Sequence, residues 1–186
     1  KGMATNAVFG FARALLRIVN EQKPTHIAMV FDAPGKTFRE ELYPDYKGHR
    51  PDTPEDLIAQ FPLIDELVEA FRMPVIRVPG VEADDVIGTL ARRADAEGIE
   101  TVIASGDKDL LQLVSDHVKV FDAYKGDNGA WYDAAAVKER YGVEPARVID
   151  VLALMGDSAD NVPGVRGIGE KTARKLLEQF ETLDGI

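Results

Sequence analysis

Apolar residues recur at helical spacing along three stretches of the chain. The first covers residues 7–19 and continues until Lys23-Pro24 interrupts the pattern. Similar patterns cover about residues 53–71 and 83–97, and Gly98 supplies a C-terminal stop for the last one. These stretches predict three helices.

Short β-branched runs alternate with these helical stretches. The runs are residues 26–31, 74–78, 101–105 and 118–121. This alternation predicts an α/β domain with a mostly parallel sheet. Such sheets bind ligands outside the carboxyl ends of their strands. Asp32 and Asp107 directly follow two of the runs, so both are expected at that edge.

The composition narrows the class of protein. A chain of 186 residues with 45% hydrophobic content suits one compact core with a small appended module. The chain has no cysteine, which excludes disulfides, thiolate nucleophiles and zinc-thiolate sites. No apolar stretch is long enough to cross a membrane, and the first residues do not lead into a secretory signal. We therefore expect a cytoplasmic protein without a membrane partner.

The formal charge of −10 at first argues against a nucleic-acid partner. Net charge misleads, however, when the excess acid lies in one metal site and the basic residues gather elsewhere. The acids do gather in motifs, at residues 81–85, 106–109 and 156–161. Crowded carboxylates repel one another unless hard cations lie between them, and such ligands suit Mg²⁺ or Mn²⁺. The predicted metal ligands are Asp32, Glu82, Asp84, Asp85, Asp107, Asp109, Asp157 and Asp160.

The spacing within two of these motifs is that of a helical face. Glu82 and Asp85 are three residues apart, and so are Asp157 and Asp160. If each motif is helical, its two acids lie on one side of the helix. The spacing therefore predicts that several carboxylates line one wall of a cleft.

A third acidic pair, Asp107 and Asp109, falls at a predicted strand-to-helix turn. An irregular turn would let both side chains point into the same cleft. The alternative for Glu82, Asp84 and Asp109 is that they are helix-start acids favoured by the helix dipole. That alternative explains single motifs better than three motifs together with Asp32.

A glycine-rich segment follows a helix that ends at residues 152–155 and precedes another that opens at Thr172. Glycines remove side chains that would block backbone N–H groups from a phosphate, and a lysine adds charge. The alternative is a plain turn between two helices. The candidate DNA-binding residues here are Gly164, Gly167, Gly169, Lys171 and Thr172.

Basic and aromatic residues interleave across residues 36–50, where hydrophobic periodicity is weak. Such a segment suits a mobile loop or arch that holds a nucleic-acid strand by charge and stacking. The alternative is a solvated loop whose aromatic side chains pin it down. The candidate strand-binding residues are Arg39, Tyr43, Tyr46, Lys47 and Arg50.

The chain resembles the 5′-nuclease family, which includes the N-terminal 5′→3′ exonuclease domain of bacterial DNA polymerase I and the flap endonucleases. The resemblance covers nearly the whole chain. It rests on Phe31-Asp32-Ala33, Thr37-Phe38-Arg39, residues 46–51, 80–85, 106–109 and 154–173. It implies a PIN-like three-layer α/β fold with a mostly parallel central sheet. It further implies a nuclease core at residues 1–150, with a helical arch at 33–55, and a helix-three-turn-helix (SAM-like) subdomain at 151–186.

The resemblance also implies roles for individual residues. The acids above match the metal site, with Glu82, Asp84, Asp107 and Asp109 in its central group. The arch residues receive a 5′ single strand, and Lys47 and Arg50 act catalytically on the scissile phosphate. The glycine-rich segment grips duplex backbone and in this family often holds K⁺.

One departure from the family pattern concerns the start of the chain. The family begins with a strand that ends in an Asp-Gly pair, and Lys1 follows that region. We therefore expect the chain to lack the N-terminal strand and one metal ligand, and to be inactive as a fragment. The far C-terminal end of the domain and any fused polymerase are expected to lie beyond residue 186.

The function hypothesis is a structure-specific, metal-dependent 5′→3′ exonuclease and 5′-flap endonuclease of DNA replication and repair. Its partner would be 5′-flap, nicked or branched duplex DNA, and the protein would act as a monomer. One alternative is a module that binds branched DNA without cleaving it. Another is a PIN-type ribonuclease, which would lack the glycine-rich duplex-binding turn.

Overall fold

The computed structural model describes residues 2–186, which form two compact units. The first unit contains the residues up to Lys36 together with Pro51–Ala83, and the second contains Thr37–Arg50 and Asp84–Ile186. Each unit therefore joins segments that are distant in the sequence. No helix within residues 2–186 has the length and apolar character that crossing a membrane requires.

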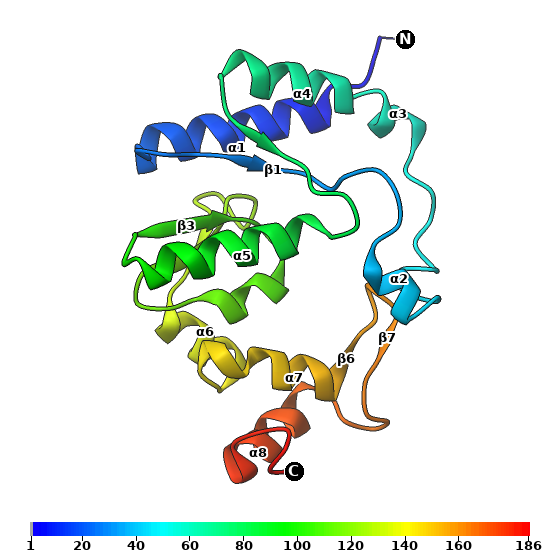
Figure 1. Ribbon diagram of the computed structural model, residues 1–186, viewed down its shortest axis with the longest axis vertical. Coiled ribbons are helices and arrows are strands. Elements are labelled where there is room, and N and C mark those ends of the chain that lie inside the picture. The colour runs from blue at the N-terminus through cyan, green and yellow to red at the C-terminus, as the bar shows by residue number, and fades with distance from the viewer. Residues whose placement is uncertain (1) are drawn as a thin grey trace. The chain divides into compact units, whose positions relative to one another are not determined.

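The first unit is built on two helices and a short parallel strand pair. Its elements are α1 (Asn6–Gln22), β1 (Met29–Val30), α3 (Glu55–Ile58), α4 (Phe61–Ala70) and β2 (Val75–Ile76). α1 and α4 lie side by side (Figure 1) and bury Leu15, Val68 and Met73 between this unit's elements. Met29 pairs with Val75, which confirms a parallel pairing of the first two predicted strands, although both are shorter than predicted.

The single helix predicted at residues 53–71 is wrong, because the structure has two helices there. α3 ends at Ile58 and α4 begins at Phe61, with Pro62 in its first turn. Proline lacks the N–H that a continuous helix needs and its ring clashes with the preceding turn, so it belongs at a helix start. The apolar periodicity continues across the break between α3 and α4, so the hydrophobic pattern alone does not indicate that the helix is interrupted.

The break positions Gln60, a polar side chain that is only 1% exposed. Its Oε1 accepts hydrogen bonds from the N–H groups of Ala7 at 2.8 Å and Val8 at 3.2 Å. Thr5, the residue directly before α1, forms no side-chain hydrogen bond that caps the helix. Gln60 thus accepts hydrogen bonds from free N–H groups at the start of α1. A residue at the helix start itself usually supplies this cap.

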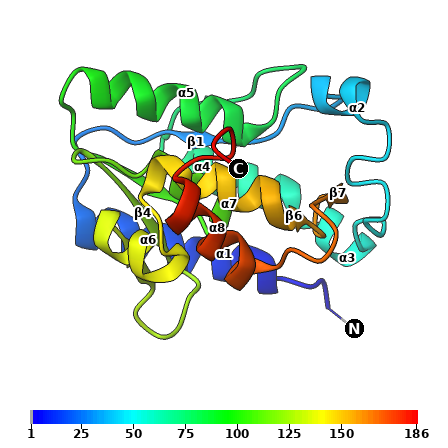
Figure 2. The ribbon, with the colours of Figure 1, turned by 90° about the horizontal axis from the view of Figure 1, so that it is seen from below.

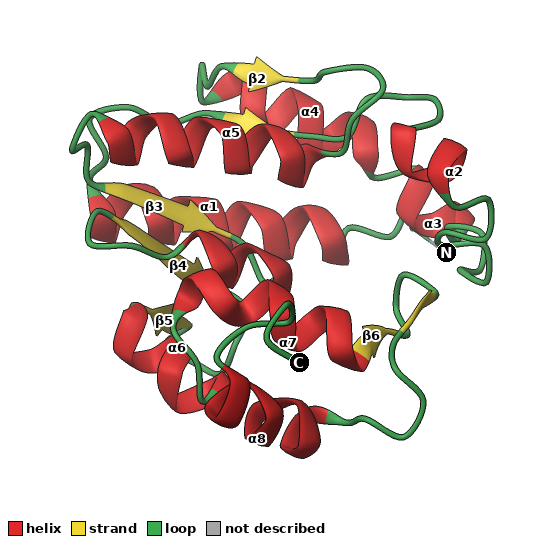
Figure 3. Ribbon diagram, turned by 60° about the horizontal axis from the view of Figure 1, so that its bottom comes forward, coloured by secondary structure: helices red, strands yellow, loops and turns green. Residues whose placement is uncertain are grey.

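The second unit contains a three-stranded sheet with helices packed on it. Its elements are α2 (Phe38–Leu42), α5 (Ala83–Ala96, whose first residue belongs to the first unit), β3 (Thr101–Ala104), η1 (Lys108–Leu113), β4 (Val118–Asp122), β5 (Ala130–Tyr132), α6 (Ala134–Tyr141), η2 (Pro145–Arg147), α7 (Val148–Met155), β6 (Gly156–Asp157), β7 (Val162–Pro163) and α8 (Glu170–Phe180). β3 and β4 are parallel, as predicted (Figure 3). β5 adds an antiparallel edge strand, with Tyr132 opposite Val120.

One hydrophobic core runs from the sheet to the last helix of the second unit. Ile103 and Val120 of the sheet belong to the same buried cluster as Val151 of α7 and Leu177 of α8. α7 and α8 lie close together, as Figure 2 shows. The C-terminal helices therefore share their core with the α/β part of this unit. The division of the chain at residue 150 stays a prediction.

Residues 156–163 differ from the predicted helical spacing. β6 and β7 form an antiparallel hairpin in which Gly156 lies opposite Pro163 and Asp157 lies opposite Val162. Gly156 has a φ of +74°, which ends α7 and turns the chain into the hairpin. Asp157 and Asp160 therefore come together through a turn and not through one face of a helix.

Candidate metal and nucleic-acid site

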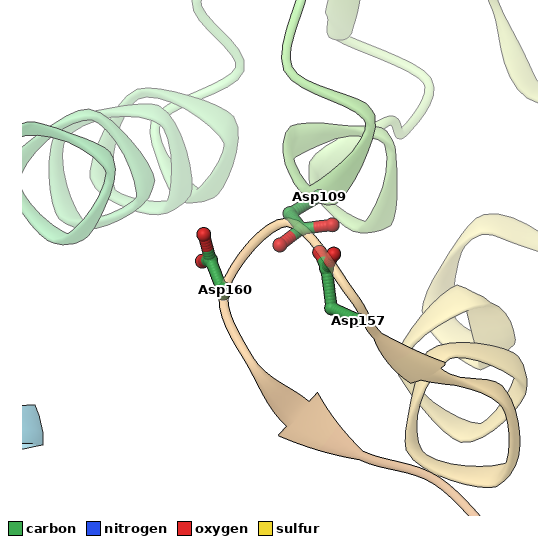
Figure 4. Close-up of side chains that lie close together, drawn as sticks. All are labelled: Asp109, Asp157 and Asp160. Carbon is green, nitrogen blue, oxygen red and sulfur yellow. The ribbon is translucent and has the colours of Figure 1, made fainter. Parts of the chain in front are cut away.

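Three carboxylates of the second unit converge at one point. Asp109, Asp157 and Asp160 each offer an oxygen within 4.8 Å of the others, and all three are half-buried (Figure 4). Asp109 lies in η1, Asp157 ends β6, and Asp160 lies in the turn before β7. These residues, called the acidic trio below, are the group with metal-ligand spacing among residues 2–186.

Two glycines hold the hairpin in the place that this convergence requires. A Cβ added to Gly164 would lie 2.1 Å from the carbonyl carbon of Met155, and one added to Gly156 would lie 2.2 Å from the Gly164 nitrogen. Only glycine allows two backbones to approach so closely. Gly164 thus has a structural reason to be glycine, whereas its predicted contact with DNA stays a prediction.

Burial and like charge act on Asp109. One of its oxygens, Oδ1, is buried without a hydrogen-bond partner among the described residues. Burial and the nearby Asp107 carboxylate raise the pKa of Asp109, and the ammonium group of Lys108 opposes that rise. A carboxylate in these surroundings is better stabilised by an added cation than by water.

Lys108 already neutralises another member of the trio. Its Nζ lies 2.6 Å from Oδ2 of Asp157. Burial would raise the pKa of Asp157, but the hydrogen bonds from Lys108 and the Ala159 N–H outweigh it, so the pKa is lowered. Burial likewise opposes the charged form of Lys108, and its bond to Asp157 raises the pKa of the lysine. Lys108 was not among the predicted site residues, although it stands between the two predicted ligands Asp107 and Asp109.

The predicted arch segment contacts the third member of the trio. The Tyr46 hydroxyl donates to Oδ2 of Asp160 at 3.0 Å, and Nη2 of Arg50 donates to Oδ1 at 2.5 Å. The backbone N–H of Lys47 donates to the Asp160 carbonyl at 2.9 Å. Lys47 itself has a left-handed backbone, with φ of +56°. The segment therefore folds into tight turns on the β6–β7 hairpin.

Arg39 and Asp85 were predicted to bind DNA and metal, respectively, and the structure brings them together. Nη1 and Nη2 of Arg39 donate to the two carboxylate oxygens of Asp85 at 2.6 and 2.7 Å. This two-point geometry is the strongest form of an arginine–carboxylate pair. It joins α2 to the first turn of α5.

Asp107 and Asp32 use carboxylate oxygens as caps for backbone N–H groups. Oδ1 of Asp107 accepts from the Asp109 N–H at 2.8 Å, and Oδ1 of Asp32 accepts from the Ala83 N–H at 2.7 Å. In the second unit, the residues with metal-ligand spacing are therefore Asp109 together with Asp157 and Asp160 of the hairpin, and Asp107 is not among them. Asp32 and Glu82 belong to the first unit, whereas Asp84 opens the second. The metal-binding roles of these four acids stay predictions.

A known protein family matches the whole chain. A family model described as "5'-3' exonuclease, N-terminal resolvase-like domain" matches residues 1–142, and one described as "5'-3' exonuclease, C-terminal SAM fold" matches residues 143–186. The chain belongs to the 5′-3′ exonuclease family. The resemblance and the fold class predicted from the sequence, a PIN-like α/β domain followed by a SAM-like subdomain, are thereby confirmed.

Individual relatives agree with this assignment. The chain is 50% identical over 187 residues to DNA polymerase I of Bacillus caldotenax, covering 100% of this chain and 21% of that protein. It is 43% identical over 186 residues to a 5′-3′ exonuclease of Aquifex aeolicus, covering 100% of this chain and 63% of that protein. The chain thus spans about a fifth of the polymerase and less than two thirds of the exonuclease.

A solved structure shares the fold of this chain. It is the bacteriophage T5 flap endonuclease in a pseudo-enzyme-product complex with DNA and metal ions. The TM-score is 0.76 at 24% identity, and the match covers 94% of this chain and 67% of the phage protein. At this identity the likeness concerns the fold.

Proposed function

We propose that this chain is a divalent-metal-dependent 5′ nuclease that hydrolyses DNA phosphodiester bonds at 5′ ends and 5′ flaps. The acidic trio is the observation that carries the proposal, since three half-buried carboxylates meet without an equal number of basic partners. Membership of the 5′-3′ exonuclease family supports it, as does the phage relative whose structure contains DNA and metal ions.

The donor set of the trio fits a hard divalent cation. Its ligands are carboxylate oxygens, which suit Mg²⁺ and Mn²⁺, and Oδ1 of Asp109 has no hydrogen bond among residues 2–186, with Nζ of Lys108 3.9 Å away. A bound cation would supply charge stabilisation and an acidified water for hydrolysis. We assign the remaining predicted ligands to one or more further metal sites. These residues are Asp32, Glu82, Asp84, Asp85 and Asp107.

The arch segment supplies cations beside the trio. Arg50 already lies against Asp160, so a small movement of its side chain would carry the guanidinium to a phosphate held near the trio. Lys47 is three residues away on the same turns and would bind the same phosphate group. Arginine and lysine stabilise negative charge that develops on phosphate oxygens. Arg39, Tyr43 and Tyr46 would hold the 5′ strand.

The start of α8 would hold duplex backbone. Gly169 is the residue before this 11-residue helix, and a Cβ added there would meet no atom within 4 Å. Open N–H groups at a helix start bind phosphates, and Lys171 adds charge one residue into the helix. We extend this site to Gly164, Gly167 and Thr172, with K⁺ as an additional ligand of the turn.

The relatives support a proposal for the cellular setting. Because the chain aligns with part of DNA polymerase I, we propose that it acts in DNA replication and repair on nicked or branched DNA in the cytoplasm, at the nucleoid. A separate 5′-3′ exonuclease in Aquifex aeolicus is compatible with a chain that works without a polymerase. We propose that it acts as a monomer.

Cleavage of labelled DNA tests the proposal. The full-length protein should cut a 5′-flap duplex in Mg²⁺ and not in excess chelator, and Asp157→Asn should lower the rate by at least about a hundredfold. Asp150→Asn is the control, because Asp150 lies on α7 outside the trio and pairs with Arg147 of η2. Binding without cleavage in every divalent cation would favour the binding-only alternative. Faster cleavage of RNA with the same branched structure would favour a ribonuclease.

A further inference from the structure

A polar cavity lies in the second unit at the carboxyl ends of β3 and β4. Its volume is about 250 Å³, and its wall includes Ser105 after β3, Asp122 at the end of β4 and Tyr132 of β5. Ligands of open α/β sheets bind outside the carboxyl ends of the strands. The cavity therefore occupies a position where a ligand is expected.

Two cations in this cavity converge on one neutral group. Nζ of Lys125 lies 2.5 Å from the Tyr132 hydroxyl oxygen, and Nη1 of Arg140 lies 3.5 Å from the same atom. Within residues 2–186, neither cation forms an ion pair with a carboxylate. Like charges held this close repel each other, and a bound anion would remove the repulsion.

Among the described residues, neither acid of the cavity wall forms an ion pair with Lys125 or Arg140. Oδ1 of Asp107 accepts the Asp109 N–H, and Oδ1 of Asp122 accepts the Tyr124 N–H at 3.0 Å. The third cation of the wall, Lys108, is held by Asp157 of the acidic trio. Lys125 and Arg140 are therefore the cations of the cavity wall that have no ion pair among the described residues.

We propose that Lys125 and Arg140, above the Tyr132 hydroxyl, form a binding site for a phosphate group. The volume lies below the roughly 300–1,000 Å³ of pockets for drug-sized ligands, which suits a single phosphate and not a whole nucleotide. A guanidinium fork and an ammonium group give a phosphate up to several charge-assisted hydrogen bonds. The ligand is inorganic phosphate or the terminal phosphate of a nucleic-acid strand. The site requires neither a divalent metal nor nuclease activity.

The experiment is a titration of the full-length protein with inorganic phosphate in excess chelator, followed by NMR of backbone and arginine side-chain N–H groups. Shifts are expected at residues 105–107, 125 and 140. Lys125→Gln and Arg140→Gln should each weaken binding by at least about tenfold. Lys138→Gln is the matched control, because Lys138 lies on the same helix as Arg140 but pairs with Glu144 at 2.5 Å. It should change the affinity by less than about twofold.

A second measurement uses the unaltered protein. Phosphate should protect Lys125 from acylation more than it protects Lys119 or Lys138, as mass spectrometry of the modified peptides would show. A 5′-phosphorylated oligonucleotide that protects Lys125 better than its 5′-hydroxyl counterpart identifies a strand terminus as the ligand. Equal protection by both, together with protection by free phosphate, identifies inorganic phosphate. Shifts confined to the 164–172 turn, or equal weakening in the Lys138 variant, would overturn the proposal.

Discussion

Arg50 and Asp160 form an ion pair across 110 residues of sequence, with 2.5 Å between Nη2 and Oδ1. Tyr46 donates to the other oxygen of the same carboxylate. Asp160 is also a member of the acidic trio. One carboxylate therefore joins the arch segment to the proposed metal site, and a cation bound by Asp160 must compete with Arg50.

The first prediction is that Mg²⁺ loosens the arch segment. Arg50 is about half exposed, so its pair with Asp160 contributes only about 0–1 kcal/mol, and its loss should speed amide exchange at residues 46–50 by up to about fivefold. Hydrogen exchange with and without Mg²⁺ measures this change. Asp160→Asn should give the faster exchange without metal and remove the response to Mg²⁺. Unchanged exchange in both cases would show that the pair persists when metal binds.

The second prediction concerns the stability of the trio. Asp109→Asn removes a charge whose buried Oδ1 has no hydrogen bond and lies 3.9 Å from Nζ of Lys108, so it should stabilise the metal-free protein by about 1 kcal/mol. The melting temperature should rise by about 2–4 °C. The same variant should lose the stabilisation that Mg²⁺ gives to the unaltered protein. A lower melting temperature without metal would mean that the attraction to Lys108 outweighs the cost of burying the Asp109 carboxylate.

The third prediction is that Lys108 competes with metal for Asp157. Lys108→Gln removes the ammonium group that lies 2.6 Å from Asp157, so the affinity for Mg²⁺ should rise while the metal-free protein loses up to about 1 kcal/mol of stability. Calorimetric titration with Mg²⁺ measures the affinity. Lys119→Gln, which removes an exposed lysine on β4, is the control for the change in net charge. Equal affinities in both variants would contradict the competition.

The sequence predicted elements well where one face of a segment decides its structure. α5 begins and ends within a residue or so of the predicted stretch, because its periodicity is continuous and Gly98 ends it with a φ of +68°. The position of the acidic trio depends on a backbone contact between two segments and not on the pattern within one segment. Asp157 reaches Asp109 through a hairpin that requires Gly156 and Gly164 in direct backbone contact, and helical spacing does not encode that contact.

Long-range polar contacts were the least predictable part of the site. Arg39 pairs with Asp85, 46 residues away, and Gln60 caps a helix that begins 54 residues earlier. Residue types and spacing indicated which groups carry chemistry. They could not indicate which opposite charges meet, because that depends on the packing of separate segments.

The fourth prediction concerns pH and the His117–Glu100 pair, which lies outside the acidic trio. The His117 side chain is 42% exposed, and its hydrogen bond with Glu100 raises the pKa of the imidazole, although desolvation opposes this rise. The protonated form is therefore favoured by folding. This contribution is fully present below the unfolded pKa of about 6.5 and is lost as the pH rises through the higher folded pKa. His117→Gln and Glu100→Gln should both reduce the fall in melting temperature between pH 6 and pH 8. A fall as large as in the unaltered protein would rule out this pair as its source.

The last prediction separates structural glycines from glycines that bind DNA. Gly164→Ala would place a Cβ 2.1 Å from the Met155 carbonyl carbon, so the hairpin must move and carry Asp157 and Asp160 away from Asp109. Gly169→Ala is the matched control, because its Cβ would meet no atom within 4 Å and its φ of −102° suits any residue. The Gly164 variant should therefore lose Mg²⁺ binding and flap cleavage by at least about tenfold each, as expected when a carboxylate ligand is displaced. The Gly169 variant should keep Mg²⁺ binding and weaken only duplex binding, because its new methyl group lies where a phosphate would approach the start of α8.

Calorimetry with Mg²⁺ and salt-dependent binding to an uncleaved duplex separate the two effects. Loss of metal binding in both variants, or in neither, would show that the contact between Gly156 and Gly164 does not set the geometry of the trio.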